Sequence, residues 1–237
     1  MSNNLIPPPR ANEQVKVPWN GIDVLFIIVI WRLLLSAPVM NAAAVPLEYL
    51  GLLPAYARYT AAFLVHIIQL AVIGLVIIRK YQLTWTSFGF RRPTRKDWLQ
   101  LLPLALLANL ISLLVPWVTF TFLWSEGSSK AESAESVGFI LTLLMGAVVA
   151  PFVEEVVNRG VIYGYLRSRF GVLAGVIVSA LIFGVGHAPE LMLNAIVTGS
   201  LFALFYERRG TLWMPVMLHG VMNATVIFIF WLSLFLR

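Results

Sequence analysis

Long apolar stretches recur along the whole chain and are separated by short polar gaps. They cover approximately residues 21–41, 57–78, 99–124, 137–158, 172–188, 191–206 and 212–236. Most approach the length of about 20 residues that an α-helix needs to cross the hydrocarbon core of a bilayer. Strands with open edges cannot satisfy their backbone hydrogen bonds in lipid, so all seven stretches are predicted to be helices. The pattern predicts an all-α polytopic membrane protein with about seven transmembrane helices, eight being the alternative count.

The composition agrees with this prediction. Hydrophobic residues make up 59% of the 237 residues and charged residues only 12%, whereas a soluble domain carries about a quarter charged residues. The polar, proline-rich residues 1–20 lack the features of a signal peptide and are expected to form a disordered cytoplasmic tail. Residues 21–237 show no internal repeat and are expected to form a single transmembrane domain. The absence of cysteine excludes disulfides, a cysteine nucleophile and thiolate metal sites.

The basic residues predict the orientation of the chain in the membrane. The formal net charge is +6, but the cations lie in short gaps between apolar stretches, which argues against a nucleic-acid partner. Thirteen of the 17 basic residues fall on one side if the N-terminus is cytoplasmic, whereas the acidic loop 125–135 falls on the other. The positive-inside rule then predicts a cytoplasmic N-terminus and an extracytoplasmic C-terminus. The aromatic and basic segment 83–98 is expected to lie at the membrane interface.

The fourth apolar stretch contains two adjacent carboxylates, which are costly inside a membrane. Glu155 and Arg159 are four residues apart and share a helix face, so they are expected to form an ion pair. Glu154 lies about 100° around the helix and remains free to act as a general base. The alternative is that these residues lie at a solvated helix end.

The fifth and last stretches carry further candidates. His187 ends the fifth stretch, and His219 and Asn223 share a face of the last one. Such a His/Asn pair can offer two hydrogen-bond donors to a developing oxyanion. His66 is expected to be a packing or hydrogen-bonding residue, and Gln69 and Asn109 are expected to bond between helices.

The spacing along the chain predicts that two of these candidates lie at one depth. If a long helix runs to Phe170 and turns at Gly171, Glu154 lies 17 residues before the turn and His187 lies 16 residues after it. At about 1.5 Å per residue, both lie about 25 Å from the turn. Small residues at Gly171, Gly175 and Ser179 would let the two helices approach closely. The same arithmetic does not bring His219 to this depth, because it follows the Gly210 turn by only nine residues.

Three motifs occur in order: Glu154-Glu155-x-x-x-Arg159, Phe183-x-x-x-His187 and His219-x-x-x-Asn223. Together they resemble the CAAX-protease and bacteriocin-processing (CPBP or Abi) family of intramembrane endopeptidases, which includes the Ras-converting CAAX prenyl endopeptidase. The resemblance covers about residues 137–226 and extends weakly to residues 88–93. It places the catalytic residues on the fourth, fifth and last helices. Asn158 stands where this family commonly has an aromatic residue, which affects the expected substrate preference.

The resemblance implies a role for each matched residue. Glu154 would activate a water that His187 positions, and His219 and Asn223 would stabilise the oxyanion. Glu155 and Arg159 would order the site. Asn158 and Phe183 are candidates for the substrate pocket. The family has been described both as metal-free and as metal-dependent, and no HExxH motif is present here. No cofactor is therefore expected, and zinc bound by His187, His219 and Glu154 is the alternative.

The expected function is hydrolysis of a peptide bond in a membrane-associated peptide or protein, with a prenylated CAAX-like peptide as the family's example. The expected partners are membrane lipid and this substrate, and the sequence does not indicate an oligomeric state. One alternative is a non-catalytic membrane scaffold or bacteriocin-immunity protein of the same fold. A second alternative is a proton-coupled transporter, since buried Glu and His residues also form proton relays.

Overall fold

The computed structural model of the chain describes residues 16–119 and 136–236, and every regular element in these two ranges is a helix. The prediction of an all-α fold is thereby confirmed. Residues 1–15, which form most of the expected tail, and the acidic loop 125–135 lie outside the described residues.

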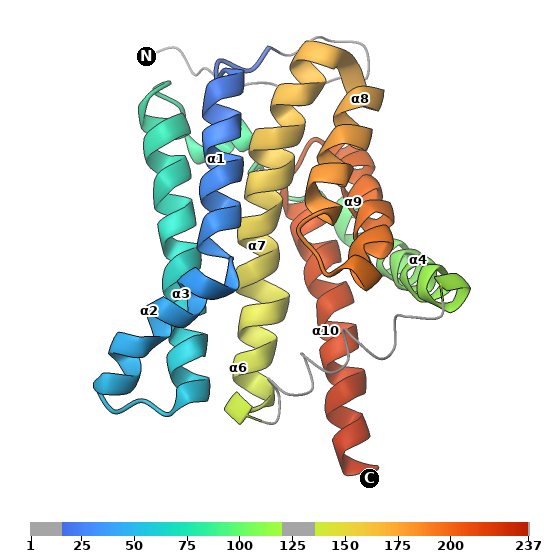
Figure 1. Cartoon of the computed structure of the whole chain (residues 1–237). Helices are drawn as coiled ribbons and strands as arrows, with labels where there is room; N and C mark the ends of the chain where they lie inside the picture. Colours follow the sequence, from blue (N-terminus) through green and yellow to red (C-terminus); the bar gives the residue numbers. More distant parts are fainter. Residues whose placement is uncertain (1–15, 120–135, 237) are drawn as a thin grey trace.

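The first half of the chain forms a bent helix pair, a long helix and an inclined helix (Figure 1). Its elements are α1 (Gly21–Leu34), α2 (Ala37–Tyr49), α3 (Pro54–Ile73) with its π-helical continuation η1 (Gly74–Arg79), the short 3-10 helix η2 (Trp85–Phe88) and α4 (Arg95–Thr119). A capping box starts α1: the Asn20 side chain accepts from the backbone N–H of Asp23, and the Asp23 carboxylate accepts from the backbone N–H of Asn20.

The second half begins with one long helical run and ends with two further helices. Its elements are α6 (Phe139–Leu143), η3 (Leu144–Val149), α7 (Ala150–Glu155), η4 (Val156–Tyr163), α8 (Gly164–Gly184), α9 (Pro189–Arg209) and α10 (Trp213–Phe235). The stretches η3 and η4 are π-helical and lie on either side of α7. π-Helical turns inside α-helices are frequent at functional sites.

Gly171 turns the long helical run back on itself, as the sequence predicts. Its backbone has φ 85° and ψ 176°, a conformation that only glycine adopts readily. The expected close approach of the two helical arms is present at Gly175, where an added Cβ would lie 3.0 Å from the Tyr163 ring and 3.2 Å from the Arg167 backbone. Ser179, one turn further on, is buried. Small residues therefore let the two arms pack tightly.

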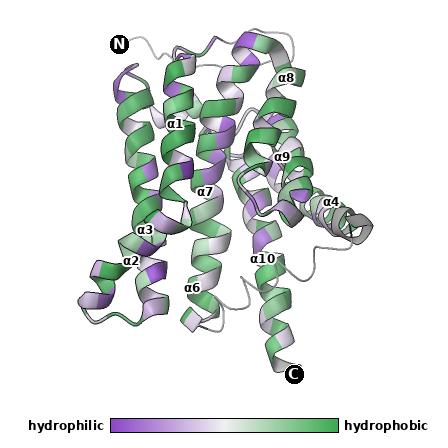
Figure 2. Cartoon of the chain, in the orientation of Figure 1, coloured by the Kyte–Doolittle hydropathy of each residue, from purple (hydrophilic) through white to green (hydrophobic). Residues whose placement is uncertain are grey.

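Three helices among the described residues are long and apolar enough to cross a membrane: Pro54–Arg79, Phe139–Gly184 and Trp213–Leu234. A fourth span results if α1 and α2, which are bent by 56° relative to each other, count as one. These helices mark the chain as an integral membrane protein, and hydrophilic patches interrupt the hydrophobic ribbon only locally, for example midway along α7 and α10 (Figure 2). The count of seven spans stays a prediction.

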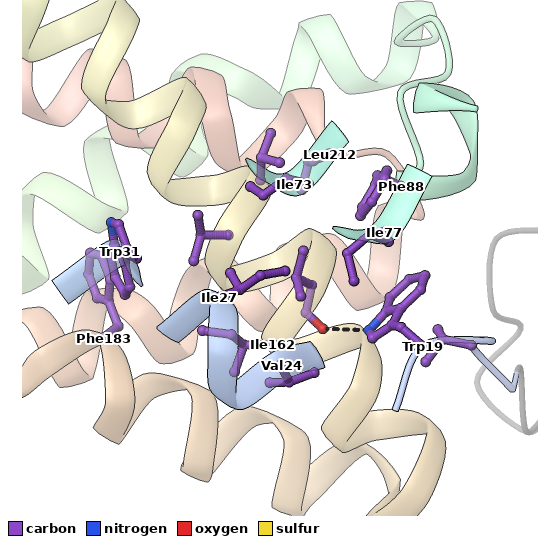
Figure 3. Packing of buried hydrophobic residues seen from close by; sticks show 14 of the residues in the cluster. Trp19, Val24, Ile27, Trp31, Ile73, Ile77, Phe88, Ile162, Phe183 and Leu212 are labelled. Carbon is purple, nitrogen blue, oxygen red and sulfur yellow. Dashed lines mark hydrogen bonds between the residues drawn. The ribbon is translucent and has the colours of Figure 1, made fainter. Parts of the chain in front are cut away.

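The main hydrophobic core fastens α1 and α3 to the long helical run (Figure 3). Trp19 donates from Nε1 to the Val161 carbonyl at 3.2 Å and stacks on Phe88, with 5.6 Å between ring centroids. Phe88 also fills the space beside Gly160, where a Cβ would lie 2.8 Å from its ring. The core thus holds η4, which directly follows Glu154 and Glu155 in the chain.

The segment 83–98 is only partly an interfacial element. Trp85 and Trp98 are exposed, as expected at a membrane interface, but Phe88 is buried. The backbone around Phe88 is held by the α9–α10 turn: Leu212 N–H donates to the Gly89 carbonyl at 2.9 Å, and the Tyr206 hydroxyl donates to the Phe88 carbonyl at 2.9 Å. The prediction from aromatic and basic composition missed this packing role, because composition does not show which aromatic ring faces the protein.

The start of α10 explains why depth arithmetic from the sequence fails for His219. Glu207, near the end of α9, binds Arg167 beside the Gly171 turn, with 2.7 Å between Oε2 and Nε. Six residues later, Trp213 contacts Phe152, with ring centroids 6.1 Å apart. Phe152 and Arg167 are 15 residues apart on the long helical run, so the chain descends deep into the bundle before α10 begins. The Gly210 turn therefore does not lie at the level of the Gly171 turn.

Candidate active site

The four residues expected to be catalytic line one cavity of about 310 Å³. Glu154 comes from α7, His187 follows the end of α8, and His219 and Asn223 come from α10. Residues of α4 and α9 complete the lining of the cavity. The structure therefore brings together residues that are up to 69 positions apart in the sequence.

A buried ion pair lies behind the cavity. Glu155 and Arg159 are 0% and 1% exposed, and 3.0 Å separates Glu155 Oε2 from Arg159 Nε. Arg159 also donates from Nη2 to the Gly199 carbonyl at 2.9 Å and packs over the rings of Phe183 and Phe202. The predicted pairing is confirmed, and the alternative of a solvated helix end is wrong. Arg159 is consequently no guide to membrane topology, although it is one of the thirteen basic residues assigned to the cytoplasmic side.

The ion pair orients the imidazole of His219. Glu155 Oε1 lies 3.0 Å from His219 Nδ1, and since a carboxylate can only accept, Nδ1 donates. Phe202 stacks on the imidazole at 5.1 Å between centroids, and Phe183 meets it edge-on at 6.0 Å. These contacts fix the ring so that its second nitrogen, Nε2, is directed towards Glu154, 3.9 Å from Oε2.

The two adjacent glutamates have different environments. The side chain of Glu154 is 20% exposed at the cavity, whereas that of Glu155 is fully enclosed and held by Arg159 and His219. Glu154 has no ion pair at helical spacing among the described residues. The asymmetry predicted from their positions on the helix is therefore present in the structure: one carboxylate is bound in a network and the other faces the cavity.

His187 and Phe183 form the end of the cavity nearest α8. His187 Nδ1 lies 3.0 Å from the carbonyl oxygen of Phe183, so Nδ1 donates and Nε2 of the neutral ring is left as an acceptor. The Phe183 ring lies edge-on to that of His187, with centroids 4.7 Å apart. Phe183 lines the cavity, in agreement with its selection as a candidate pocket residue.

Asn223 ties α10 to the long helical run. Its Nδ2 donates to the Gly146 carbonyl at 2.7 Å, which uses one of the two amide hydrogens. The two helices approach so closely here that a Cβ on Gly220 would overlap the carbonyl oxygen of Ala147. The backbone contact at Gly220 thereby sets the distance between the helices that carry Glu154 and His219.

Asn158 does not lie where the sequence analysis places it. It is fully buried, is not among the residues that line the cavity, and donates from Nδ2 to the carbonyl of Glu154 at 2.8 Å. The Asn158 side chain therefore contacts the helix that carries Glu154 and does not form part of the cavity wall. Among the described residues, the hydrogen bonds of Gln69 and Asn109 lie within one helix and not between helices as expected: Gln69 bonds His66 of α3, and Asn109 donates to the Ala105 carbonyl of α4.

Arg32 is a site-associated residue that the sequence analysis overlooks. It extends from α1 to the end of α8, where it donates to the Ile182 carbonyl and fills the space beside Gly186. An arginine inside the apolar stretch 21–41 is itself unusual, and this signal could have identified it.

The zinc alternative requires His187, His219 and Glu154 to act as three ligands of one metal ion. Among the described residues, no group of three or more His, Asp and Glu side chains is arranged so that it could hold a metal ion. His219 Nδ1 and His187 Nδ1 are engaged with Glu155 and the Phe183 carbonyl. Each imidazole is left with Nε2 as its potential metal ligand.

Comparisons with known proteins agree with these motifs. Residues 136–225 match the family described as type II CAAX prenyl endopeptidase Rce1-like. The chain is also 31% identical over 88 residues to the putative membrane peptidase YdiL of Bacillus subtilis (strain 168). Both similarities support membership of the CPBP family, on the evidence of part of the chain. The alignment with the Bacillus protein spans 37% of this chain and 36% of that protein. No solved structure matches the chain significantly.

Proposed function

We propose that the chain is an intramembrane endopeptidase that hydrolyses a peptide bond of a membrane-associated peptide or protein. The observation that carries this proposal is the convergence of Glu154, His187, His219 and Asn223 on one cavity. The family match and the similarity to a putative membrane peptidase support it. A prenylated CAAX-like peptide is the substrate that the name of the family suggests.

The proposed reaction starts with a water in the cavity. The Glu154 carboxylate removes a proton from this water, while Nε2 of His187 accepts its second hydrogen and so positions it. The hydroxide attacks the carbonyl carbon of the scissile peptide and forms a tetrahedral oxyanion. The C–N bond then breaks, and the proton held by Glu154 passes to the leaving amine. Water is consumed, and one carboxylate and one amine are formed.

Stabilisation of the oxyanion is assigned to His219 and Asn223. Asn223 has one amide hydrogen beyond the one given to Gly146. His219 donates through Nδ1 to Glu155, so donation to the oxyanion from Nε2 requires the doubly protonated imidazolium. Glu155 and Arg159 act by fixing this ring and do not touch the substrate.

The proposed reaction uses no metal. Activity should therefore survive exhaustive chelation of the purified protein. Stoichiometric zinc in active protein, with activity lost on its removal and regained on its return, would contradict this part of the proposal.

The decisive experiment is the cleavage of a peptide library in liposomes by wild-type protein and Glu154→Gln. Loss of the general base is expected to lower kcat by about 100-fold or more. The matched control is Glu48→Gln, which removes an exposed glutamate on α2 and is expected to cleave like the wild type. Wild-type turnover by Glu154→Gln would reject the assignment. A wild-type protein that cleaves no peptide would favour a scaffold, and Glu154-dependent proton flux without cleavage would favour a transporter.

We propose in addition that the N-terminus is cytoplasmic and the C-terminus extracytoplasmic. The start of α1 and the end of α10 lie at opposite ends of the bundle (Figure 1), and the cations in the short gaps favour this orientation. The chain has no cysteine, so single cysteines at Arg92 and Leu236 can be labelled without background. Labelling of both from the same side would contradict the proposed orientation.

A further inference from the structure

The cavity has a second polar wall that the proposed reaction does not use. It is formed by Asn109 and Ser112 of α4 and by Asn194 and Thr198 of α9. These side chains line the same cavity as Glu154, His219 and Asn223. A polar wall is unexpected here, because a cavity inside a membrane protein that held only hydrocarbon would be lined by apolar side chains.

Asn194 differs from its neighbours in having an unused hydrogen-bonding atom. Asn109 donates to the Ala105 carbonyl of its own helix at 2.8 Å, and the Thr198 hydroxyl bonds the Asn194 carbonyl of its own helix at 2.9 Å. The Asn194 side chain instead donates from Nδ2 across to Ser112 Oγ at 3.1 Å. Its Oδ1 is covered from solvent and has no hydrogen-bond partner among the described residues.

The bond to Ser112 has a direct consequence for Asn194. Because α4 and α9 are both anchored through this bond, the amide is held in one orientation, and its oxygen is presented as a fixed acceptor. Buried polar atoms are rarely left without a partner, and those that are call for an explanation. An unpaired acceptor on a residue that lines a polar cavity is suited to a ligand that brings an N–H group.

We propose that Asn194 is a substrate-binding residue whose Oδ1 accepts a hydrogen bond from a main-chain N–H of the peptide in the cavity. This inference rests on the proposed peptidase function. A helical substrate keeps its N–H groups within the helix, whereas a peptide bond open to attack lies in an extended segment with exposed N–H groups. Away from water such a group needs an acceptor from the protein.

The position of Asn194 gives this bond a role in specificity. Glu154, His219 and Asn223 act on the scissile carbonyl, and Asn194 holds an N–H of the same segment. With both ends fixed, Asn194 determines which peptide bond faces Glu154. The residue thus sets the register of cleavage and takes no part in the chemical step.

The test uses a peptide that the wild-type protein cleaves in liposomes, and a series in which each backbone N–H around the scissile bond is methylated in turn. One position is expected to be sensitive: its methylation should lower kcat/KM of the wild type by about tenfold, the effect of losing one buried hydrogen bond. Asn194→Leu should show a similar loss with the unmodified peptide, mainly through KM. It should lose nothing further when the sensitive position is methylated. Ser112→Ala, which frees the amide to rotate, should give a smaller loss in the same direction.

Several outcomes separate this inference from the proposed function. Ser200→Ala is the control: the Ser200 hydroxyl bonds its own helix at the Ile196 carbonyl and lies outside the cavity lining, so the methylation profile should stay that of the wild type. If Asn194→Leu cleaves at the same bond with the wild-type KM and methylation profile, the inference is wrong while the peptidase assignment stands. The same conclusion follows if Asn194→Leu folds poorly and Ser112→Ala keeps the wild-type profile. If turnover does not depend on Glu154, the proposed function fails first.

Discussion

The polar cavity and an apolar groove lie on opposite faces of α10 and of the helical run η3–α7. The groove, which has a volume of about 670 Å³, is lined by α3, by Leu143 and its neighbours on the helical run, and by the α10 face that includes Val216 and Gly220. Along α10, His219 and Asn223 face the cavity, whereas Val216 and Gly220 face the groove. Neighbouring residues thus belong to different environments.

This difference shows how a membrane helix can carry catalytic groups at low cost. Polar side chains spaced three or four residues apart stay on one face, where helices α4, α7 and α9 surround them, and the other face remains apolar. His66 is the one polar side chain on the groove among its described lining residues, and its Nδ1 lies 2.9 Å from Gln69 Oε1 of the same helix. The helix contact at Gly220 and Ala147 lies between the two spaces.

The largest expected effect comes from the buried pair that supports the polar cavity. Glu155→Gln and Arg159→Met should each destabilise the protein by about 3–5 kcal/mol, because each leaves its partner charged and enclosed. The double variant should recover part of this loss. Melting temperatures in detergent provide the measurement. A double variant no more stable than either single variant would mean that the two residues do not act as a pair.

A methyl group added at Gly220, where α10 contacts the long helical run, should have the next largest effect. In Gly220→Ala the new Cβ overlaps the Ala147 carbonyl oxygen, so α10 must move, and a loss of about 1–3 kcal/mol is expected. Because His219 and Asn223 move with α10, turnover should fall by at least about tenfold.

Gly74→Ala is the matched control for this variant. Gly74 also lies in a helix, but nothing approaches the position of its Cβ within 4 Å. The change should be neutral or stabilising by up to about 1 kcal/mol. If the two alanine variants have equal melting temperatures and equal turnover, the close contact at Gly220 does not set the distance between the helices that carry Glu154 and His219.

The smallest expected effect concerns the apolar groove. His66→Leu leaves the Gln69 oxygen without its partner, and the double variant with Gln69→Leu removes both polar groups, so the double variant should be at least as stable as the single one. Both should cleave peptide like the wild type, whereas His219→Leu should not. Comparable losses of turnover in His66→Leu and His219→Leu would show that the groove and the cavity are functionally connected.

The sequence alone determined the features that depend on local chemistry. Apolar runs specify helices because lipid leaves the backbone no other partner, and Gly171 specifies a turn because the backbone there needs a positive φ. The pairing of Glu155 with Arg159 follows from helical spacing. The three motifs include five residues that line the cavity: Glu154, Phe183, His187, His219 and Asn223.

Only the tertiary structure decided the features that depend on packing between distant segments. The level at which α10 begins follows from where Gly89 and Phe88 hold the turn before it, and no spacing within α10 reveals this. Asn158 bonds its own helix, Arg32 of α1 donates to the Ile182 carbonyl of α8, and Asn194 bonds Ser112, 82 residues away in the sequence. In each case the partner of the side chain depends on how the helices pack together. A single helix fixes which residues share a face, but it does not fix which neighbouring helix that face contacts.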